Sequence, residues 1–204
     1  MRAARHLVIF TRYPKAGAGK RRLAAGVGDV QAVRFSRVRL VVLVARMARD
    51  LRWTTLLAVT PDGARKGIGP WPAGVDVIGQ GRGDLGQRMG RVFRALPPGP
   101  VVIIGSDCPA VRGRHVARAF AELGGKQAVF GPASDGGYWL VGLDWRQRKA
   151  LPFEGVRWSS EFALADTVRN IDGPVALVDR LDDVDDARDL ARCPDWGRVV
   201  GSVK

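Results

Sequence analysis

The sequence predicts an α/β protein, a three-layer α/β/α sandwich built around a mixed, mainly parallel central sheet. The main observation is that short β-rich runs alternate with segments of helical period along the whole chain. In addition, no linker, internal repeat or low-complexity stretch divides the 204 residues. We therefore expect a single domain that covers residues 1–204.

Each predicted strand is a short apolar or β-branched run bounded by turn signals. The run 54–60 ends at Pro61-Asp62-Gly63, and the run 101–104 follows Pro97-Pro98-Gly99-Pro100. In chain order, the predicted strands occupy residues 6–10, 54–60, 75–80, 101–104, 128–130, 138–143 and 175–178.

The predicted helices lie between these runs or follow the last one. Asp29 is expected to cap a helix that continues to Asp50, and Ser159 or Ser160 to cap a helix that ends at Val168. The other predicted helices occupy residues 85–95, 114–123 and 184–190. In such sheets, ligands bind at the carboxyl ends of the strands. The loops expected there are 11–22, 81–89 and 106–108.

Composition favours a soluble protein with a packed core. Hydrophobic residues make up 46% of the chain, which excludes a wholly disordered chain. The longest apolar run, Leu40–Ala45, is far shorter than the roughly 20 residues that a membrane span requires. The N-terminal apolar run, Leu7–Phe10, is too short for a secretory signal. We therefore expect a cytoplasmic protein without a membrane span.

The cysteines and histidines give no sign of a zinc site or of a catalytic triad. Cys108 and Cys193 lie far apart and form no CxxC pair, so they are expected to be free thiols, one of them buried. His6 and His115 are the only histidines in the sequence and are expected to have structural roles. A histidine general base is therefore not expected.

Charge is the unusual feature of the composition. Lys and Arg number 33 against 20 Asp and Glu, a net charge of +13. This excess suggests an anionic partner, either nucleic acid, a membrane surface or a phosphorylated small molecule, although a compositional preference for Arg would also produce it. Residues 1–52 hold 13 basic groups and only two Asp, whereas residues 179–189 hold six Asp. A site that binds phosphates at one end and a divalent cation at the other would use both.

The loop 11–23, TRYPKAGAGKRRL, combines glycines with basic residues between a strand and a helix. The backbone at Gly17 and Gly19 can approach an anion closely, and Lys20 and Arg22 can donate charge-assisted hydrogen bonds to phosphate oxygens. Because Arg21 stands where a Walker A loop has Ser or Thr, this is not a Walker A loop. A solvated basic loop is the alternative.

The stretch GRGDLG at 81–86 is a formal GxGxxG between a strand and a helix. Asp107 even stands at the sequence distance of a ribose-binding acid. However, the stretch does not follow the first strand, and a lone match of this kind has little specificity. The alternative is a glycine-rich loop that lines a nucleotide pocket without dinucleotide geometry.

Two acidic features favour a divalent cation. Asp107 directly follows the strand predicted at 101–104, which would hold its carboxylate rigidly at the edge of the sheet. The segment LDDVDDARDL at 181–190 supplies further carboxylates, and oxygen ligands suit a hard cation. Helix capping is the alternative for both features, since acidic side chains also stabilise helix N-termini.

Two further motifs each have a structural and a functional interpretation. Asp135-Gly136-Gly137 could form only a hairpin turn, or it could pack closely against a ligand. Trp158 and Ser159 could supply an aromatic wall for a ligand, or a buried side chain and a helix cap.

Taken together, these motifs resemble the DUF2064 proteins, also described as selenodomain-associated transferases, which are similar to the nucleotide-binding core of GT-A glycosyltransferases. The chain is also similar to 2-phospholactate guanylyltransferases and to molybdenum-cofactor guanylyltransferases. The resemblance extends from Phe10 to Leu190. It depends on residues 10–23, 83–89 (GDLGQRM), 104–109 (IGSDCP), 132–143 (PASDGGYWLVGL), 158–160 and 181–190.

The resemblance implies a GT-A-like fold and a divalent cation, Mg²⁺ or Mn²⁺, as cofactor. It implies Asp107 as the first metal ligand, completed by Asp185 and Asp183. It also implies that Lys20 and Arg22 bind nucleotide phosphates, so the candidate catalytic residues are Asp107, Lys20 and Arg22. The residues expected to contact the nucleotide or substrate are Arg12, Gly17, Gly19, Lys20, Arg22, Gly83, Asp84, Leu85, Arg88, Asp135, Gly136, Gly137, Trp158 and Ser159.

The function favoured by the motifs and the resemblance is a metal-dependent, glycosyltransferase-like transfer from a nucleotide-sugar donor to an unidentified acceptor. The alternative is nucleotidyl transfer, in which a phosphorylated acceptor attacks an NTP and pyrophosphate leaves. Motif spacing does not separate the two reactions. Two other classes are a nucleic-acid-binding module, for which no recognised motif appears, and a transferase fold that binds nucleotide without turnover.

Overall fold

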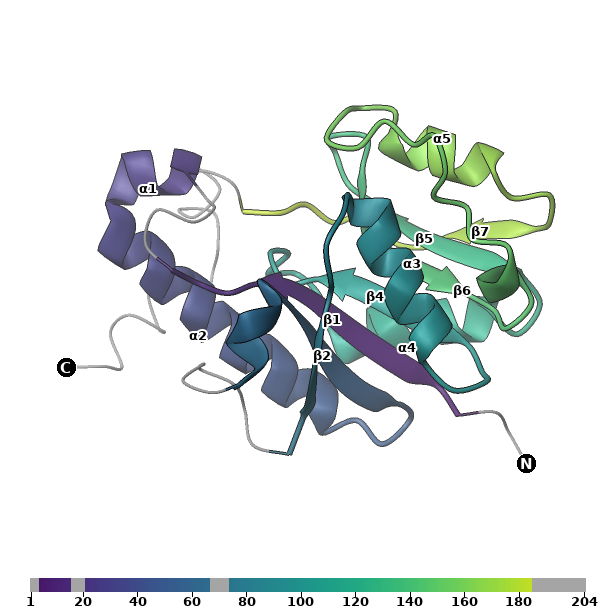
Figure 1. Cartoon of the computed structure of the whole chain (residues 1–204), viewed down its shortest axis with the longest axis horizontal. Coiled ribbons are helices and arrows are strands. Elements are labelled where there is room, and N and C mark those ends of the chain that lie inside the picture. The colour runs from purple at the N-terminus through teal and green to yellow at the C-terminus, as the bar shows by residue number, and fades with distance from the viewer. Residues whose placement is uncertain (1–3, 16–20, 67–73, 185–204) are drawn as a thin grey trace.

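The computed structural model describes residues 4–15, 21–66 and 74–184, and its central feature is a seven-stranded sheet (Figure 1). The strand order is β3-β2-β1-β4-β6-β5-β7. All neighbouring strands are parallel except β6, which is antiparallel to both β4 and β5. The strands are β1 (His6–Arg12), β2 (Thr54–Thr60), β3 (Asp76–Gly79), β4 (Val101–Gly105), β5 (Ala128–Pro132), β6 (Tyr138–Leu143) and β7 (Val175–Leu177). The expected mixed, mainly parallel sheet is confirmed.

Helices cover both faces of this sheet. Leu43 of α2 and Phe120 of α4 belong to the buried core on one face. Phe93 of α3 belongs to the core on the other face, where Leu164 and Val168 of α5 also pack. Figure 1 shows α3 lying across the front of the sheet. The α-helices are α1 (Arg21–Val27), α2 (Asp29–Ala48), α3 (Leu85–Ala95), α4 (Gly113–Glu122) and α5 (Ala163–Arg169), and 3₁₀ helices lie at Asp62–Lys66 and Gln147–Lys149. The predicted three-layer sandwich is confirmed.

The region of α1 and α2 differs from the prediction in two ways. Asp29 does not cap α2, because Gly28 occupies the N-cap position with a φ of 82°, a conformation that glycine adopts readily. The sequence also predicts no element at 21–27, where the structure has α1.

Within the described part of the chain, no helix has the length and apolar character needed to cross a membrane.

The predicted serine cap of α5 is wrong, because this helix begins at Ala163 and its N-cap is Phe162. Ser160 instead holds the preceding turn, where its hydroxyl donates to the carbonyl of Arg157. Ser159 lies in this turn with a φ of 60°.

The capping alternative for Asp107 is also wrong, because α4 begins at Gly113 with Arg112 at its N-cap. In the helix predicted at 184–190, Val184 is not helical, and the rest of that range lies outside the described residues.

After β7 the chain runs along the carboxyl ends of several strands, and we call residues 178–184 the crossing segment. The backbone N–H of Val178 donates to Phe130 at 2.8 Å, that of Leu181 donates to Pro132 at 3.1 Å, and that of Val184 donates to Asp107 at 3.3 Å. The buried side chain of Val184 then packs with residues of α1 and α2, namely Leu23, Ala32 and Phe35. The crossing segment therefore links β5, the end of β4 and the first two helices.

Arg148 is a buried cation, only 3% exposed, without a carboxylate partner among the described residues. Its guanidinium donates to backbone carbonyls at the end of α3 and beyond, those of Phe93, Leu96, Pro97 and Gly99. These carbonyls would otherwise lack helical partners, so Arg148 completes the hydrogen bonding of this helix end. Burial lowers the pKa of Arg148.

We expect Arg148→Met to lower the free energy of unfolding by about 2–4 kcal/mol, because buried carbonyls would lose their donors. Urea denaturation followed by tryptophan fluorescence measures this loss. Arg146→Met, a change at an exposed neighbour, should stay within about 0.5 kcal/mol of the parent protein. Equal losses in the two variants would contradict the structural role of Arg148.

The two histidines are buried in environments that disfavour their charged form. Neither ring nitrogen of His6 has a hydrogen-bond partner among the described residues. Burial, and then the positive charge of Arg148, lower the pKa of His6. His115 accepts a hydrogen bond at Nδ1 from the backbone of Arg112, and burial is the main cause of its lowered pKa.

Because these pKa values lie below the ordinary value of 6.5, the unfolded chain binds protons first as the pH falls. We therefore expect the stability contribution of the neutral histidines to be fully present above pH 6.5 and to decline as the pH falls toward the lowered values. Thermal midpoints across this range test the expectation. His6→Leu should show a smaller loss on acidification than the parent protein, and an unchanged pH profile would refute the role of His6.

Candidate functional site

The candidate site lies at the carboxyl edge of the sheet, where β1 and β4 end side by side. In their parallel register Phe10 is paired with Gly105, so the next residues of the two strands are neighbours. The hydroxyl of Ser106 donates to the hydroxyl of Thr11 at 3.0 Å, and the backbone N–H of Ser106 donates to Phe10 at 3.2 Å. Arg12, the last residue of β1, and Asp107, which follows β4, therefore lie at the same edge of the sheet.

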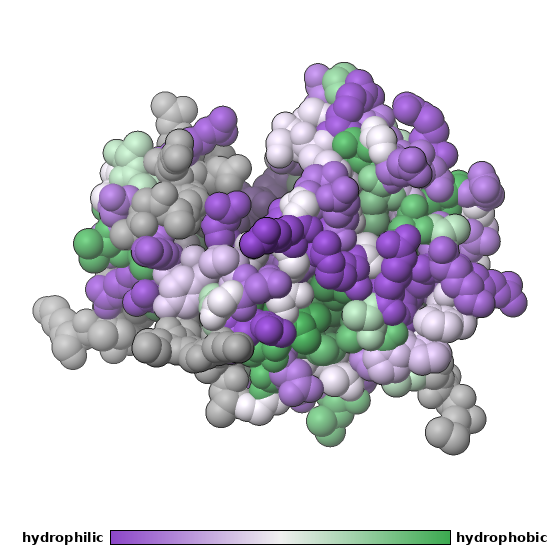
Figure 2. Space-filling view, viewed as in Figure 1, coloured by the Kyte–Doolittle hydropathy of each residue, from purple (hydrophilic) through white to green (hydrophobic). Residues whose placement is uncertain are grey.

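The surface above these strand ends is indented. Figure 2 shows this indentation between the part of the molecule that carries α1 and the part that carries α5, with hydrophilic residues along its described walls. In Figure 1 the crossing segment passes through the same region. A polar ligand would therefore meet the strand ends and the crossing segment together.

The crossing segment brings carboxylates to Asp107. Val184 is hydrogen-bonded to the carbonyl of Asp107, which places Asp183 next to that residue. Burial first, and then the negative charges of Asp183 and Asp182, raise the pKa of the neighbouring Cys108 thiol to about 12. Asp182 itself accepts a hydrogen bond from the backbone of Ser134 at 2.9 Å. Cys108 is buried and free, as expected for one of the two cysteines.

Carboxylate oxygens are the donors that Mg²⁺ and Mn²⁺ prefer, so Asp107 and Asp183 fit such a cation chemically. Asp185, the other expected ligand, lies outside the described residues. Within 4–15, 21–66 and 74–184, no group of three or more His, Cys, Asp or Glu side chains is placed to hold a metal ion.

A buried glutamine organises the basic side of the site. The carboxamide of Gln80 donates to the carbonyls of Thr11 at 3.0 Å and Ala58 at 2.8 Å, and its oxygen accepts from Arg88 at 3.0 Å. Burial, and then the positive charge of Arg12, lower the pKa of Arg88. Two of the expected binding residues, Arg12 and Arg88, therefore lie near one another.

The expected phosphate loop is only partly described. Gly17, Gly19 and Lys20 lie outside the described residues. Arg22 is exposed on α1, and the next residue, Leu23, packs against Val184 of the crossing segment. The helix that carries Arg22 is therefore held beside the acidic segment.

The glycine-rich loop before α3 acts as a helix cap. The carboxylate of Asp84 accepts from the backbone of Gln87 at 2.7 Å, and the Gln87 side chain accepts in return from the backbone of Asp84 at 3.2 Å. Gly83 has a φ of 108°, and a Cβ there would lie 2.1 Å from the Gln87 side chain, so only glycine fits. Leu85 begins the helix and is partly exposed.

The Asp135-Gly136-Gly137 stretch forms the turn of the β5–β6 hairpin. The backbone of Gly137 donates to the Asp135 carboxylate at 2.9 Å, and the carbonyl of Gly136 accepts from the backbone of Leu164 at 3.0 Å. A Cβ at Gly136 would lie 2.1 Å from the carbonyl oxygen of Glu161. The close packing at this glycine is therefore against the protein's own backbone.

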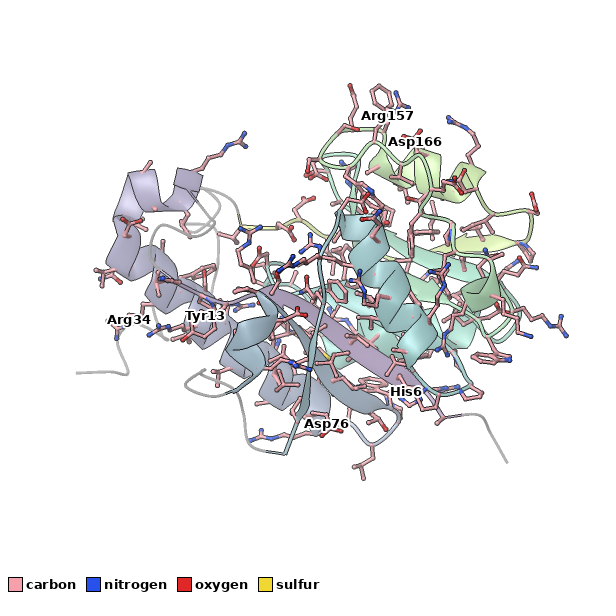
Figure 3. All side chains as sticks on the ribbon, viewed as in Figure 1. His6, Tyr13, Arg34, Asp76, Arg157 and Asp166 are labelled. Atoms are coloured by element: carbon pink, nitrogen blue, oxygen red, sulfur yellow. The ribbon has the colours of Figure 1, made fainter. Side chains whose placement is uncertain are left out.

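Trp158 is a half-buried side chain beside the N-terminus of α3. Its ring lies near those of Tyr138 and Phe153, and a Cβ at Gly86 would lie 2.7 Å from it. The turn that follows is fixed by Asp166, which accepts two side-chain hydrogen bonds from Arg157 at 2.8 Å; Figure 3 shows this pair beside α5. These bonds hold the pKa of Asp166 well below its ordinary value.

The sequence did not single out four polar residues of this region as candidate site residues: Thr11, Gln80, Ser106 and Asp182. Thr11, Ser106 and Asp182 lie within the motifs quoted above, but their partners are far away in the chain, so the motifs do not show what they bind. The one available signal is position, because Thr11, Gln80 and Ser106 each lie at the end of a predicted strand.

Comparisons with solved structures agree with this fold. A candidate nucleotide-diphospho-sugar transferase from Desulfovibrio desulfuricans G20 is 27% identical, with a TM-score of 0.79, over 91% of this chain and 84% of that chain. The 2-C-methyl-D-erythritol 4-phosphate cytidylyltransferase from Thermus thermophilus is 18% identical, with a TM-score of 0.59, over 97% of this chain and 100% of that chain. Rv0371c from Mycobacterium tuberculosis H37Rv, solved in complex with manganese, is 16% identical, with a TM-score of 0.56, over 95% of this chain and 98% of that chain.

The last two similarities concern the fold alone. With the first, they confirm the predicted nucleotide-diphospho-sugar transferase type of fold. The first similarity, at 27% identity, also agrees with the expected assignment of the chain to the transferases. At the level of sequence, no protein of curated function matches the chain.

The family described as "Uncharacterized protein conserved in bacteria (DUF2064)" matches residues 43–160, which is more than half of the chain and includes β4, Asp107 and the glycine-rich loop. The resemblance expected from the motifs is thereby confirmed: the chain belongs to the DUF2064 family.

Proposed function

We propose that this protein is a metal-dependent, glycosyltransferase-like enzyme that uses a nucleotide-sugar donor. The observation that carries the proposal is the meeting of acidic and basic groups at one edge of the sheet. Asp107 and Asp183 come from segments that are distant in sequence. Arg12 lies at the end of β1, and Arg88 of α3 lies near it and donates to Gln80, which follows β3. Charged side chains that only interact with water would not need to come together from distant segments, so the convergence supports a ligand-binding site.

In this proposal Asp107, Asp183 and Asp185 hold Mg²⁺ or Mn²⁺. When bound, such an ion neutralises negative charge on phosphate oxygens and on a leaving diphosphate. The manganese complex of Rv0371c, a protein of the same fold, supports a divalent cation.

The protein's own part is to bind and orient the donor. Lys20 and Arg22 stabilise the diphosphate electrostatically from the α1 side. The hydrogen bond between Ser106 and Thr11 fixes the ends of β4 and β1, so Asp107 is presented from a rigid position. The N-terminus of α3 and the turn at Gly136 are proposed to form further walls of the nucleotide and substrate site.

Nucleotidyl transfer is the second candidate, favoured by the similarity of fold to a cytidylyltransferase over the whole of that chain. The same groups would serve it, because both reactions develop charge on a departing phosphate group. The difference lies in which bond breaks: the sugar C–O bond in glycosyl transfer, or the bond to the α-phosphorus in nucleotidyl transfer.

We expect Asp107→Asn to abolish the stimulation of nucleotide binding by Mn²⁺, because the amide removes the charge that attracts the cation. A thermal-shift panel of NTPs and NDP-sugars, each with and without Mg²⁺ or Mn²⁺, measures this, since a bound ligand raises the apparent thermal midpoint. Asp76→Asn is the matched control, at the opposite edge of the sheet (Figure 3), and should leave the stimulation intact. Unchanged stimulation in Asp107→Asn would refute the metal assignment.

The reaction type is tested by its products. With water as the acceptor in place of the unidentified one, we expect incubation with NDP-sugars and Mn²⁺ to release a nucleoside diphosphate and the free sugar by slow hydrolysis. Incubation with NTPs under the same conditions should release no pyrophosphate. A coupled assay for inorganic pyrophosphate and chromatography of the nucleotides measure both. Pyrophosphate release from one NTP would replace the glycosyl proposal with the nucleotidyl one, whereas salt-sensitive binding of nucleic acid without any nucleotide effect would refute both.

A further inference from the structure

Gln80 is a buried side chain with a single possible orientation. It is 2% exposed, and both N–H bonds of its carboxamide point to backbone carbonyls, those of Thr11 and Ala58. Because a carbonyl cannot donate, the carboxamide oxygen must face the other way, toward Arg88. The backbone of β1 and β2 therefore fixes the position of the carboxamide oxygen that accepts from Arg88.

The hydrogen bonds of Arg88 all go to neutral acceptors, although the Asp84 carboxylate lies close enough to act on its charge. Its Nη1 donates to Gln80 at 3.0 Å and its Nε donates to the backbone carbonyl of Asp84 at 3.2 Å. The Asp84 carboxylate is engaged in capping α3. Among the described residues, the second terminal nitrogen of Arg88 has no hydrogen-bond partner, and no carboxylate forms an ion pair with this guanidinium.

Arg12 adds a second cation at the same place. It follows Thr11, whose carbonyl binds Gln80, so β1 delivers Arg12 to the neighbourhood of Arg88. Its side chain is exposed and forms no ion pair within the described part of the chain. Elsewhere on this surface exposed arginines do pair with acids, as Arg118 does with Asp179 at 3.0 Å. The Asp84 carboxylate, which caps α3, offsets part of the charge at Arg88 without forming an ion pair with it. The neighbouring guanidinium groups of Arg12 and Arg88 therefore still repel one another unless an anion lies between them.

We infer that Gln80 is a positioning residue that holds Arg88 beside Arg12 as a phosphate-binding pair. A neutral acceptor suits this role, since it fixes the guanidinium without neutralising its charge. Guanidinium groups match phosphate oxygens in geometry and bind them by charge-assisted hydrogen bonds. The inference rests on the proposed function for the source of the phosphate, either the nucleotide or a phosphorylated second substrate.

Calorimetric titration with inorganic pyrophosphate, in the absence of metal, tests the pair. We expect Arg88→Met and Arg12→Met each to weaken binding about tenfold, the size of one charge-assisted contact. Gln80→Met should weaken it by a smaller factor, and Gln80→Glu by at least as much as Arg88→Met, because a carboxylate would neutralise the guanidinium. Arg94→Met, which removes an exposed arginine from the same helix, is the charge-matched control and should bind like the parent protein.

A double-mutant cycle separates positioning from a merely structural role. If Gln80 acts through Arg88, Gln80→Met should not weaken pyrophosphate binding further once Arg88 is Met. Its effect on the thermal midpoint should be similar in both backgrounds. Equal losses of affinity in the two backgrounds, or unchanged affinity in Arg88→Met, would overturn the inference. Arg12→Met changes an exposed side chain, so it tests the pair even if the Gln80 variants fail to fold.

The same titrations distinguish this inference from the proposed function. If no nucleotide in the thermal-shift panel binds but pyrophosphate binding still depends on Arg88, the proposed function fails and the pair stands. If nucleotides bind with metal while the pyrophosphate affinities of all variants are equal, the proposed function stands and the phosphate-binding pair fails. Competition between pyrophosphate and a bound nucleotide would assign the pair to the nucleotide phosphates, and simultaneous binding would assign it to a second, phosphorylated substrate.

Discussion

The parallel pairing of β1 with β4 is the constraint on which the site depends. Parallel strands end at the same edge of a sheet, so the residues after each strand become neighbours even though about 95 positions separate them in the chain. The bond between Ser106 and Thr11 fixes that juncture. Were the two strands antiparallel, Arg12 and Asp107 would leave the sheet at opposite edges, and no local sequence feature could bring them together.

The single reversed strand, β6, lets the acidic segment reach this edge. Because β6 runs antiparallel to β4 and β5, β5 again points the same way as β1 and ends on the site side. The crossing segment leaves the sheet through its bond to Phe130 and then follows the strand ends to Asp107. Burial of Val184 between α1 and α2 anchors its far end. The topology thus explains how residues near the end of the described chain reach the same edge of the sheet as the end of β1.

The parts that could be predicted from the sequence are those set by local pattern. Strands such as β4 are continuous apolar runs, because helices bury both of their faces, and α3 occupies the predicted range 85–95. The start of α2 was mispredicted because Gly28, a residue with no capping side chain, takes the cap position through its backbone. The role of Gln80 could not be predicted, since Thr11 and Ala58 lie 69 and 22 positions away and meet it through the pairing of β1, β2 and β3. Its third partner, Arg88, comes from α3.

The distribution of ion pairs argues that this edge is more than a solvated basic face. A protein with a net charge of +13 has too few acids to pair every base, so unpaired arginines are expected at exposed positions where water stabilises them. Arg148 and Arg88 both depart from that rule. Backbone carbonyls accept from every guanidinium nitrogen of Arg148. Arg88 differs, because it is half-buried, lies near another cation and has one terminal nitrogen without a hydrogen-bond partner among the described residues. Burying a guanidinium group without a counter-ion costs free energy, and an anionic ligand bound beside Arg88 would offset that cost. The cost is therefore better explained by binding than by surface solvation.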